Sequence, residues 1–332
     1  MAAPTNVAQN KIFNPAHFFI KHYYNTYLCE FNFKHKQLKM KYLYFAIIVT
    51  LAACGGDSFL GGSNDEGGSK IDTTTHNKYA WHGIYDYKNS LVNRIPAPLG
   101  FDRVEVEKGS FADWLRHLPL KSDSTDVLLH TGAPKQNQNI HEAVVNIDTG
   151  EKDLQQCADA IMRLKGEYHF SRNEFDKIHF NYTMNDTKVA FSDWAVGAKP
   201  IPVPEQNLVY FYSPHEEADY SYTNFKSYME SIFNYAGTLS LHREMIQVVP
   251  NDLQIGDVFI QGGSPGHAVL VVDMATSYAG EKRFLLAQSY MPAQDIHLLK
   301  NTAFEHISPW HMTSVMDMKT PEWDFTINDI RR

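Results

Sequence analysis

The amino-acid sequence predicts an α+β fold, with an antiparallel sheet and helices packed on one side of it. The helical patterns fall within residues 110–235, and consecutive short apolar runs separated by Gly and Pro follow in residues 257–299. Helices first and strands later is the order typical of α+β domains. A content of 43% hydrophobic and 20% charged residues indicates a globular chain with a buried core.

The N-terminal segment is expected to lie outside this fold. Met40-Lys41 precedes an apolar run too short to span a membrane, and the run ends in Leu-Ala-Ala-Cys54. This order resembles the bacterial lipobox, in which the signal is cut before the cysteine and the cysteine is lipidated. It predicts a bacterial cell-envelope protein, lipid-anchored to a membrane on its periplasmic or outer face. The predicted parts are 1–39 untranslated upstream sequence, 40–53 signal peptide, 54–77 lipidated Cys54 with a flexible Gly-rich tether, and 78–332 a single globular domain.

Charge and cysteine content narrow the classes of partner. The net charge is −8, and residues 1–53 hold six Lys and one Glu, which leaves −13 for the rest. So acidic a surface repels nucleic-acid phosphates, and we expect no nucleic-acid partner. With Cys54 lipidated, Cys157 is the only thiol of the mature chain, so no intramolecular disulfide is expected.

The first half of the domain begins with a strand at Arg103–Glu107, whose residues alternate between charged and apolar. Ser110 then caps a short helix that Pro119 ends. Its apolar residues fall on one face: Phe111, Trp114, Leu115 and Leu118. The elements predicted after it are strands at 127–130 and 143–147, a helix at 152–165, strands at 175–183 and 208–212, and an amphipathic helix at 222–235.

The last third contains the predicted sheet. Four apolar runs are separated by turn-forming residues, and Tyr278–Glu281 is a hairpin connection between the second and third. The predicted strands are 257–260, 268–274, 284–288 and 296–299.

Cys157 is a candidate nucleophile, because it lies near the start of a predicted helix. Unpaired N–H groups and the helix dipole stabilise a thiolate at that end. The alternative is a core cysteine, since Leu154, Cys157 and Ile161 have helical spacing on one face.

His267 follows a Gly/Pro loop and opens an apolar strand, and Gln288 lies on the next strand. This order resembles the papain-like amidase families NlpC/P60 and CHAP. In these families the catalytic Cys comes first, followed by a strand that begins with Gly-Asp and then by a strand that carries the His. CHAP also has a Gln-Cys pair, like Gln156-Cys157 here. The resemblance implies Cys157 as nucleophile, His267 as general base and Gln288 as the orienter of the imidazole. Asp273 is a weaker candidate orienter. The long stretch between Cys157 and His267 requires an insertion.

The leading hypothesis is therefore a thiol amidase or peptidase that acts on peptide or peptidoglycan amide bonds, with no metal or organic cofactor. Gln156 is a candidate for supporting the oxyanion. The alternative is a non-catalytic envelope module that binds glycan, peptide or a partner protein, with Cys157 in the core. Its site would lie around His267, Gln288, Tyr290, Gln294 and His297. A metal site built from His267, His297 and a carboxylate is a third reading, but the spacing is not diagnostic.

The chain as a whole resembles an uncharacterised bacterial lipoprotein family, domain of unknown function 4846. This resemblance spans roughly Pro96 to Trp323 and implies one integral domain with an envelope location. The segments that carry it are Ser110–Leu120, Asp153–Ala160, Tyr235–Ser240, Pro265–Val269 and Gln288–Gln294.

Overall fold

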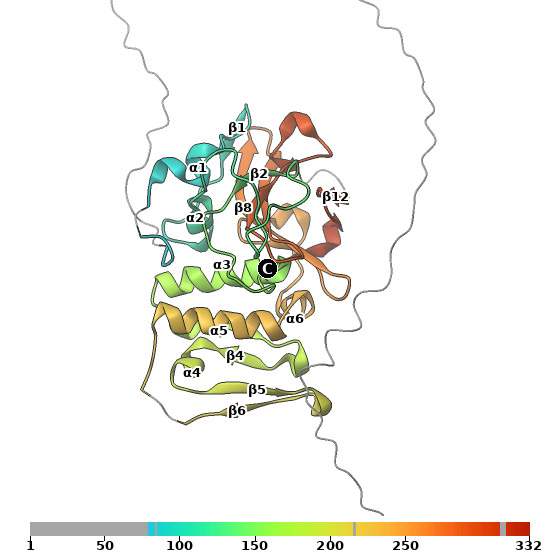
Figure 1. Cartoon of the computed structure of the whole chain (residues 1–332). Coiled ribbons are helices and arrows are strands. Elements are labelled where there is room, and N and C mark those ends of the chain that lie inside the picture. Colours follow the sequence, from blue (N-terminus) through green and yellow to red (C-terminus); the bar gives the residue numbers. More distant parts are fainter. Residues whose placement is uncertain (1–78, 84, 215–216, 313–316) are drawn as a thin grey trace, which may run out of the picture. The chain divides into compact units, whose positions relative to one another are not determined.

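A computed structural model describes residues 79–83, 85–214, 217–312 and 317–332 (Figure 1). The described residues belong to one compact unit. The predicted upstream sequence, signal peptide, lipidation site and tether (residues 1–77) lie outside them, so these predictions stay untested. Within the described residues, no helix has the length and apolar character needed to cross a membrane.

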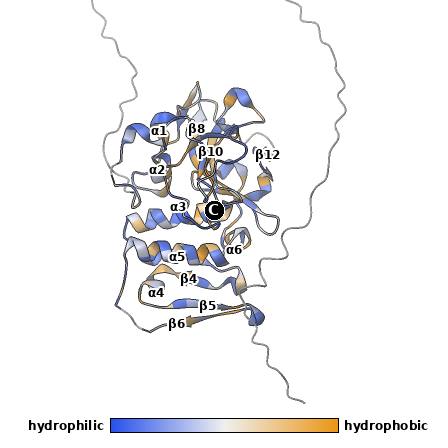
Figure 2. Cartoon of the chain, in the orientation of Figure 1, coloured by the Kyte–Doolittle hydropathy of each residue, from blue (hydrophilic) through white to orange (hydrophobic). Residues whose placement is uncertain are grey.

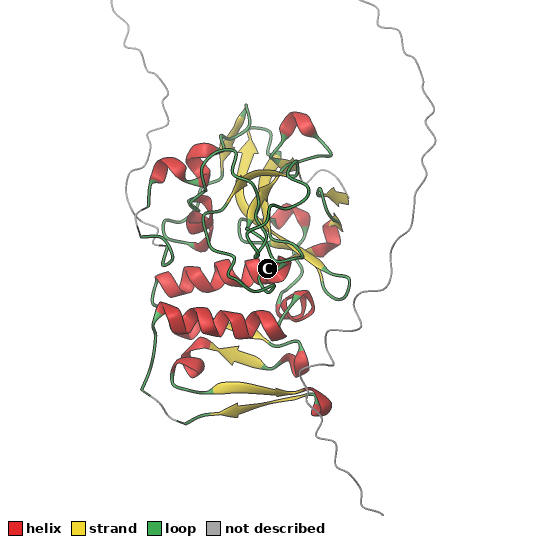
Figure 3. Ribbon diagram, in the orientation of Figure 1, coloured by secondary structure: helices red, strands yellow, loops and turns green. Residues whose placement is uncertain are grey.

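The central feature is an antiparallel sheet, which confirms the predicted α+β class (Figure 3). Its main path runs in the order β14-β7-β8-β9-β10-β2, with β1 paired to β8 and β11 paired to β9. The strands are β1 (Phe101–Arg103), β2 (His141–Val144), β7 (Val258–Gln261), β8 (His267–Ser277), β9 (Lys282–Gln288), β10 (His297–Leu299), β11 (His311–Met312) and β14 (Ile330–Arg331).

Both faces of this sheet are buried, by different parts of the chain. Ala268 and Leu270 on β8 belong to the larger core cluster, together with residues of helix α3 (Cys157–Ser171). Val269 and Val271 belong to a second cluster that contains Phe325. Helices therefore cover one face, and C-terminal segments, including the hairpin of β12 (Asp317–Lys319) and β13 (Asp324–Thr326), cover the other.

The long connection between α3 and β7 forms further layers beneath the sheet. Helix α5 (Tyr222–Tyr235) lies alongside α3 and separates it from two small strand pairs (Figure 1). Figure 2 shows hydrophilic and hydrophobic bands along α5, as expected of a helix with one buried face. The other elements of this insertion are β3 (His179–Asn181), β4 (Lys188–Ala190), α4 (Phe191–Ala195), β5 (Lys199–Val203), β6 (Leu208–Tyr212) and α6 (Thr238–Glu244).

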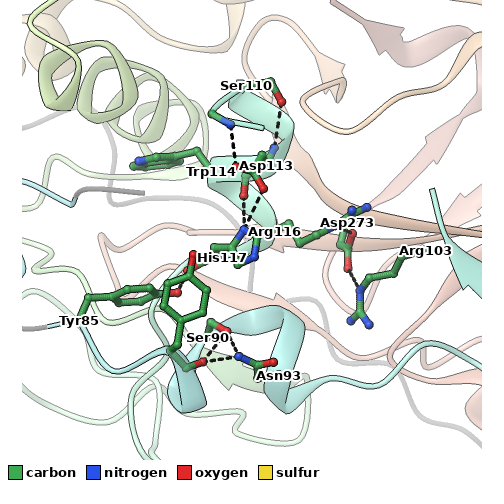
Figure 4. Close-up of polar contacts among 12 residues, drawn as sticks. Tyr85, Ser90, Asn93, Arg103, Ser110, Asp113, Trp114, Arg116, His117 and Asp273 are labelled. Carbon is green, nitrogen blue, oxygen red and sulfur yellow. Dashed lines mark hydrogen bonds and ion pairs between the residues drawn. The ribbon is translucent and has the colours of Figure 1, made fainter. Parts of the chain in front are cut away.

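An N-terminal segment packs against β8 around Asp273 (Figure 4). It contains α1 (Leu91–Arg94) and α2 (Phe111–Arg116), and the Ser110 side chain accepts a hydrogen bond from the Asp113 N–H at 3.2 Å. This contact is the predicted N-terminal cap of α2.

Several predicted bounds were wrong. Helix α3 begins at Cys157 rather than at residue 152, because short backbone hydrogen bonds such as Leu154 N–H to Lys152 O hold the preceding residues in turns. The strand predicted at 103–107 is β1, which ends at Arg103. Residues 127–130 form only isolated bridges, and the predicted strand 175–183 shrinks to β3.

Candidate functional site

Cys157 is the first residue of α3, and its thiol is half-buried. Burial raises the pKa of this thiol to about 11, and the nearby Asp159 carboxyl acts in the same direction. Hydrogen bonds from the backbone N–H groups of Ala158, Ala268 and Cys157 itself act against this shift. The sulfur thus lies between the start of α3 and the first residues of β8, and its resting form is the protonated thiol.

His267 is the first residue of β8, and a tightly packed glycine loop delivers it there. A Cβ on Gly266 would lie 2.5 Å from both Gly263 O and Thr238 Oγ1. This is closer than side-chain carbons approach in folded proteins, so only glycine fits beside α6 at this point. The loop therefore fixes where the β8 backbone starts, and with it the His267 side chain.

The His267 ring is buried and oriented by a polar partner. Its Nε2 lies 2.9 Å from Gln288 Oε1, and the ring centroid lies 4.9 Å from that of Tyr290. The rings of Trp323 and Phe325 also pack on it, with centroid-to-centroid distances of 5.5 and 5.8 Å. Burial lowers the pKa of His267 to about 4, with the Lys135 charge acting in the same direction. At neutral pH the imidazole is uncharged and able to accept a proton.

Gln288 ends β9, and its side-chain amide connects three other side chains. Besides the contact with His267, its Nε2 donates to Glu322 Oε2 at 2.7 Å and lies 3.4 Å from His297 Nε2. The predicted partnership of His267 and Gln288 is therefore present as a direct hydrogen bond between neighbouring strands.

Cys157 and His267 approach the end of β8 from different sides of the sheet. The His267 ring stacks on Phe325, on the face opposite α3, whereas the thiol contacts the Ala268 N–H from the α3 side. Both are the first residues of their elements. Among the described residues no hydrogen bond joins the sulfur to the imidazole, so the action of His267 as a base toward Cys157 stays a prediction.

The remaining predicted site residues are placed as follows. Gln156 is half-buried, and its Nε2 donates to Asp153 Oδ1 at 3.2 Å. Tyr290 is half-buried beside His267. Gln294 and His297 are both 0% exposed, so a ligand has no surface of either to touch in this conformation.

Asp273 does not orient His267. Its carboxylate is buried at the other end of β8, where it pairs with Arg103 Nε at 2.6 Å and Arg116 Nε at 2.7 Å (Figure 4). The strand carries it too far from His267 for any contact, because each residue advances ~3.3 Å. Across the described ranges, no group of three or more His, Cys, Asp or Glu is placed to hold a metal ion. The hypothesis of a metal site at His267, His297 and a carboxylate therefore gains no support.

Sequence reasoning missed three side chains at this site. Lys135, Glu322 and Trp323 reach it from a loop before β2 and from the turn between β12 and β13. No local pattern marks them, because their contacts join segments that are far apart in the sequence.

A family model described as a domain of unknown function, number 4846, matches residues 91–332. No curated protein matches the chain, and no solved structure matches it.

Proposed function

The chain belongs to the family of domain of unknown function 4846, and we propose its function from the geometry of the site. The protein is a cell-envelope lipoprotein whose domain is a thiol amidase or peptidase for peptide or peptidoglycan amide bonds. One observation carries this proposal. The thiol that starts α3 contacts the Ala268 N–H, next to a histidine whose Nε2 is held by Gln288.

In this proposal each group has one task. Cys157 is the nucleophile, at the end of a helix whose free N–H groups favour negative charge on sulfur. His267 acts through Nδ1 as general base, which requires its ring to reach the α3 side of β8 where the sulfur lies, while Gln288 holds Nε2. The Cys157 and Ala158 N–H groups, which act on the sulfur, would donate to the developing oxyanion.

The directions of the two pKa shifts define the resting state. The thiol keeps its proton and the imidazole is neutral, so no ion pair exists before substrate binds. The proton passes from sulfur to Nδ1 as the sulfur attacks the amide carbon. The imidazolium then gives that proton to the leaving amine, and water hydrolyses the thioester to a carboxylate and the free thiol.

The envelope location rests on the Met40–Cys54 signal alone. Mass spectrometry of the membrane fraction tests it directly. The expected N-terminal peptide begins at a lipid-modified Cys54, and an unmodified peptide from residues 1–39 would contradict it.

The enzymatic part is tested with a chain in which Cys29 and Cys54 are replaced by Ser, so that Cys157 is the sole thiol. We expect peptidoglycan stem peptides to be hydrolysed, with a loss in Cys157→Ser and His267→Ala. Iodoacetamide should modify Cys157 in the folded protein, more slowly without His267, and faster as the pH rises through 9, since the thiol pKa is raised. Modification only after unfolding would mean a core cysteine and leave a non-catalytic binding module as the function.

A further inference from the structure

Glu322 and Lys135 form an ion pair directly behind Gln288. Glu322 Oε2 accepts the Gln288 amide N–H at 2.7 Å, and its Oε1 lies 2.7 Å from Lys135 Nζ. The two side chains are only 16% and 9% exposed. We propose that Glu322, held by Lys135, is a positioning residue that selects the tautomer of His267 by fixing the side-chain amide of Gln288. This inference deepens the proposed function and rests on it.

The first step concerns the orientation of the Gln288 amide. An amide in a protein can face its partners in either of two ways, and the hydrogen-bond network decides which one holds. An ionised carboxylate only accepts hydrogen bonds. Glu322 therefore takes the NH₂ side of Gln288, which turns Oε1 toward His267 at 2.9 Å.

The second step concerns His267. Because the amide oxygen only accepts, the Nε2 that faces it carries the proton. In a neutral imidazole the other nitrogen, Nδ1, then has the free lone pair. If the amide were reversed, its NH₂ would face Nε2, the proton would move to Nδ1, and that nitrogen could no longer take the proton of the Cys157 thiol.

His297 supports the same orientation. Its Nδ1 lies 2.9 Å from the backbone oxygen of Asp295, which only accepts, so Nδ1 carries the proton and Nε2 is an acceptor. That Nε2 lies 3.4 Å from the Gln288 NH₂. The NH₂ group of Gln288 therefore faces two acceptors, Glu322 Oε2 and His297 Nε2, and its oxygen faces one donor, His267 Nε2.

Lys135 completes the arrangement. Its ammonium neutralises the charge of a carboxylate that is mostly shielded from water, and it lies 5.2 Å from the centre of the Tyr290 ring. A shielded carboxylate without a partner is costly, so removing Lys135 favours a Glu322 that turns toward solvent and releases Gln288.

The test measures the tautomer directly. In long-range proton–nitrogen correlation spectra of the full chain labelled with ¹⁵N-histidine, His267 is identified by the signals lost in His267→Gln. We expect Nε2 protonated and Nδ1 unprotonated in the wild type. In Glu322→Ala the two nitrogen shifts should move toward each other, and the rate of Cys157 alkylation at pH 7 should fall, because Nδ1 then carries a proton in part of the molecules. Glu281→Gln, which alters the pair between exposed Glu281 and buried Arg283 far from His267, is the control and should change neither.

Two outcomes separate this inference from the proposed function. An unchanged His267 tautomer in folded Glu322→Ala overturns the inference even if the wild type is an active amidase. A shifted tautomer supports it even if no amide substrate is found, in which case the amidase fails alone. Should Glu322→Ala not fold, Lys135→Met decides in the same way, by the presence or absence of the shift.

Discussion

The two ends of β8 carry buried polar clusters of opposite character. At the far end, the Asp273 carboxylate is 0% exposed and has two arginine partners, Arg103 and Arg116. At the near end, His267 is 1% exposed and is held at Nε2 by an uncharged amide, while Nδ1 takes part in no hydrogen bond among the described residues. Both clusters join the strand to segments distant in sequence.

This difference separates a structural cluster from a candidate reactive one. The Asp273 charge is matched by cations of the protein itself, as a buried charge must be to persist. At His267 the protein orients the ring but leaves one nitrogen for another partner. Burial alone therefore does not distinguish the two clusters; they differ in whether the buried group has a charged partner.

Replacing His267 should have the largest effect of these changes, and that effect should be a loss of activity. His267→Ala is expected to lower kcat/KM on the amide substrate by about 10²–10⁴-fold, because a general base is lost. Its thermal midpoint should change far less than that of Asp273→Ala. A full loss of folded protein would instead mean that the near end is as structural as the far end.

Replacing Asp273 should have the reverse result. Asp273→Ala leaves the Arg103 and Arg116 guanidinium groups without their buried partner, which should lower the free energy of unfolding by about 3–5 kcal/mol. Urea unfolding measures the loss. The His267 tautomer, followed by NMR, should stay as in the wild type, and a shifted tautomer would show that the two ends are coupled.

Acid should destabilise the fold through buried histidines. In the unfolded chain imidazoles titrate near ~6.5, whereas burial lowers the pKa of His267 to about 4 and those of His297 and His311 to about 3. Below ~6.5 the unfolded chain binds protons that the folded chain does not, so stability is full above that pH and is lost as pH falls toward 4.

Each of these histidines contributes a slope of about 1.4 kcal/mol per pH unit in that window. Urea unfolding from pH 7 to 4 measures it, and His297→Gln should reduce the slope by one such contribution. An unchanged slope would mean that His297 is protonated in the folded protein.

The smallest effect is expected from the cap of α2. Ser110→Ala removes the bond to the Asp113 N–H and should cost about 1 kcal/mol. Since α2 carries Arg116, this change loosens only the Asp273 end. Urea unfolding should detect it, while Cys157 alkylation should keep its wild-type rate.

The sequence predicted the elements whose pattern is local. Helix α5 has the expected bounds, Tyr222–Tyr235, because its apolar spacing and its Ser221 cap act within one segment. The strands of His267 and Gln288 were also predicted, because long apolar runs bounded by Gly and Pro need no other segment to be recognised.

The misses have two origins, one local and one distant. The start of α3 was misplaced by five residues because local signals were overlooked: the Asp159 side chain bonds the Gln156 N–H, and turns hold the residues before it. The Glu322 contact with Gln288 and its pair with Lys135 join three separate segments, and no periodicity encodes such a meeting.

The order of these segments along the chain has a consequence during synthesis. A ribosome that has just released β9 has exposed Cys157, His267 and Gln288, but not yet Glu322 or the aromatic residues that cover the ring. Glu322 follows His267 by 55 of the 332 residues, so the histidine is synthesised before the residue that sets its tautomer. The proposed reactivity of the thiol would then arise only after the β12–β13 hairpin has packed against the sheet, and not in the incomplete chain.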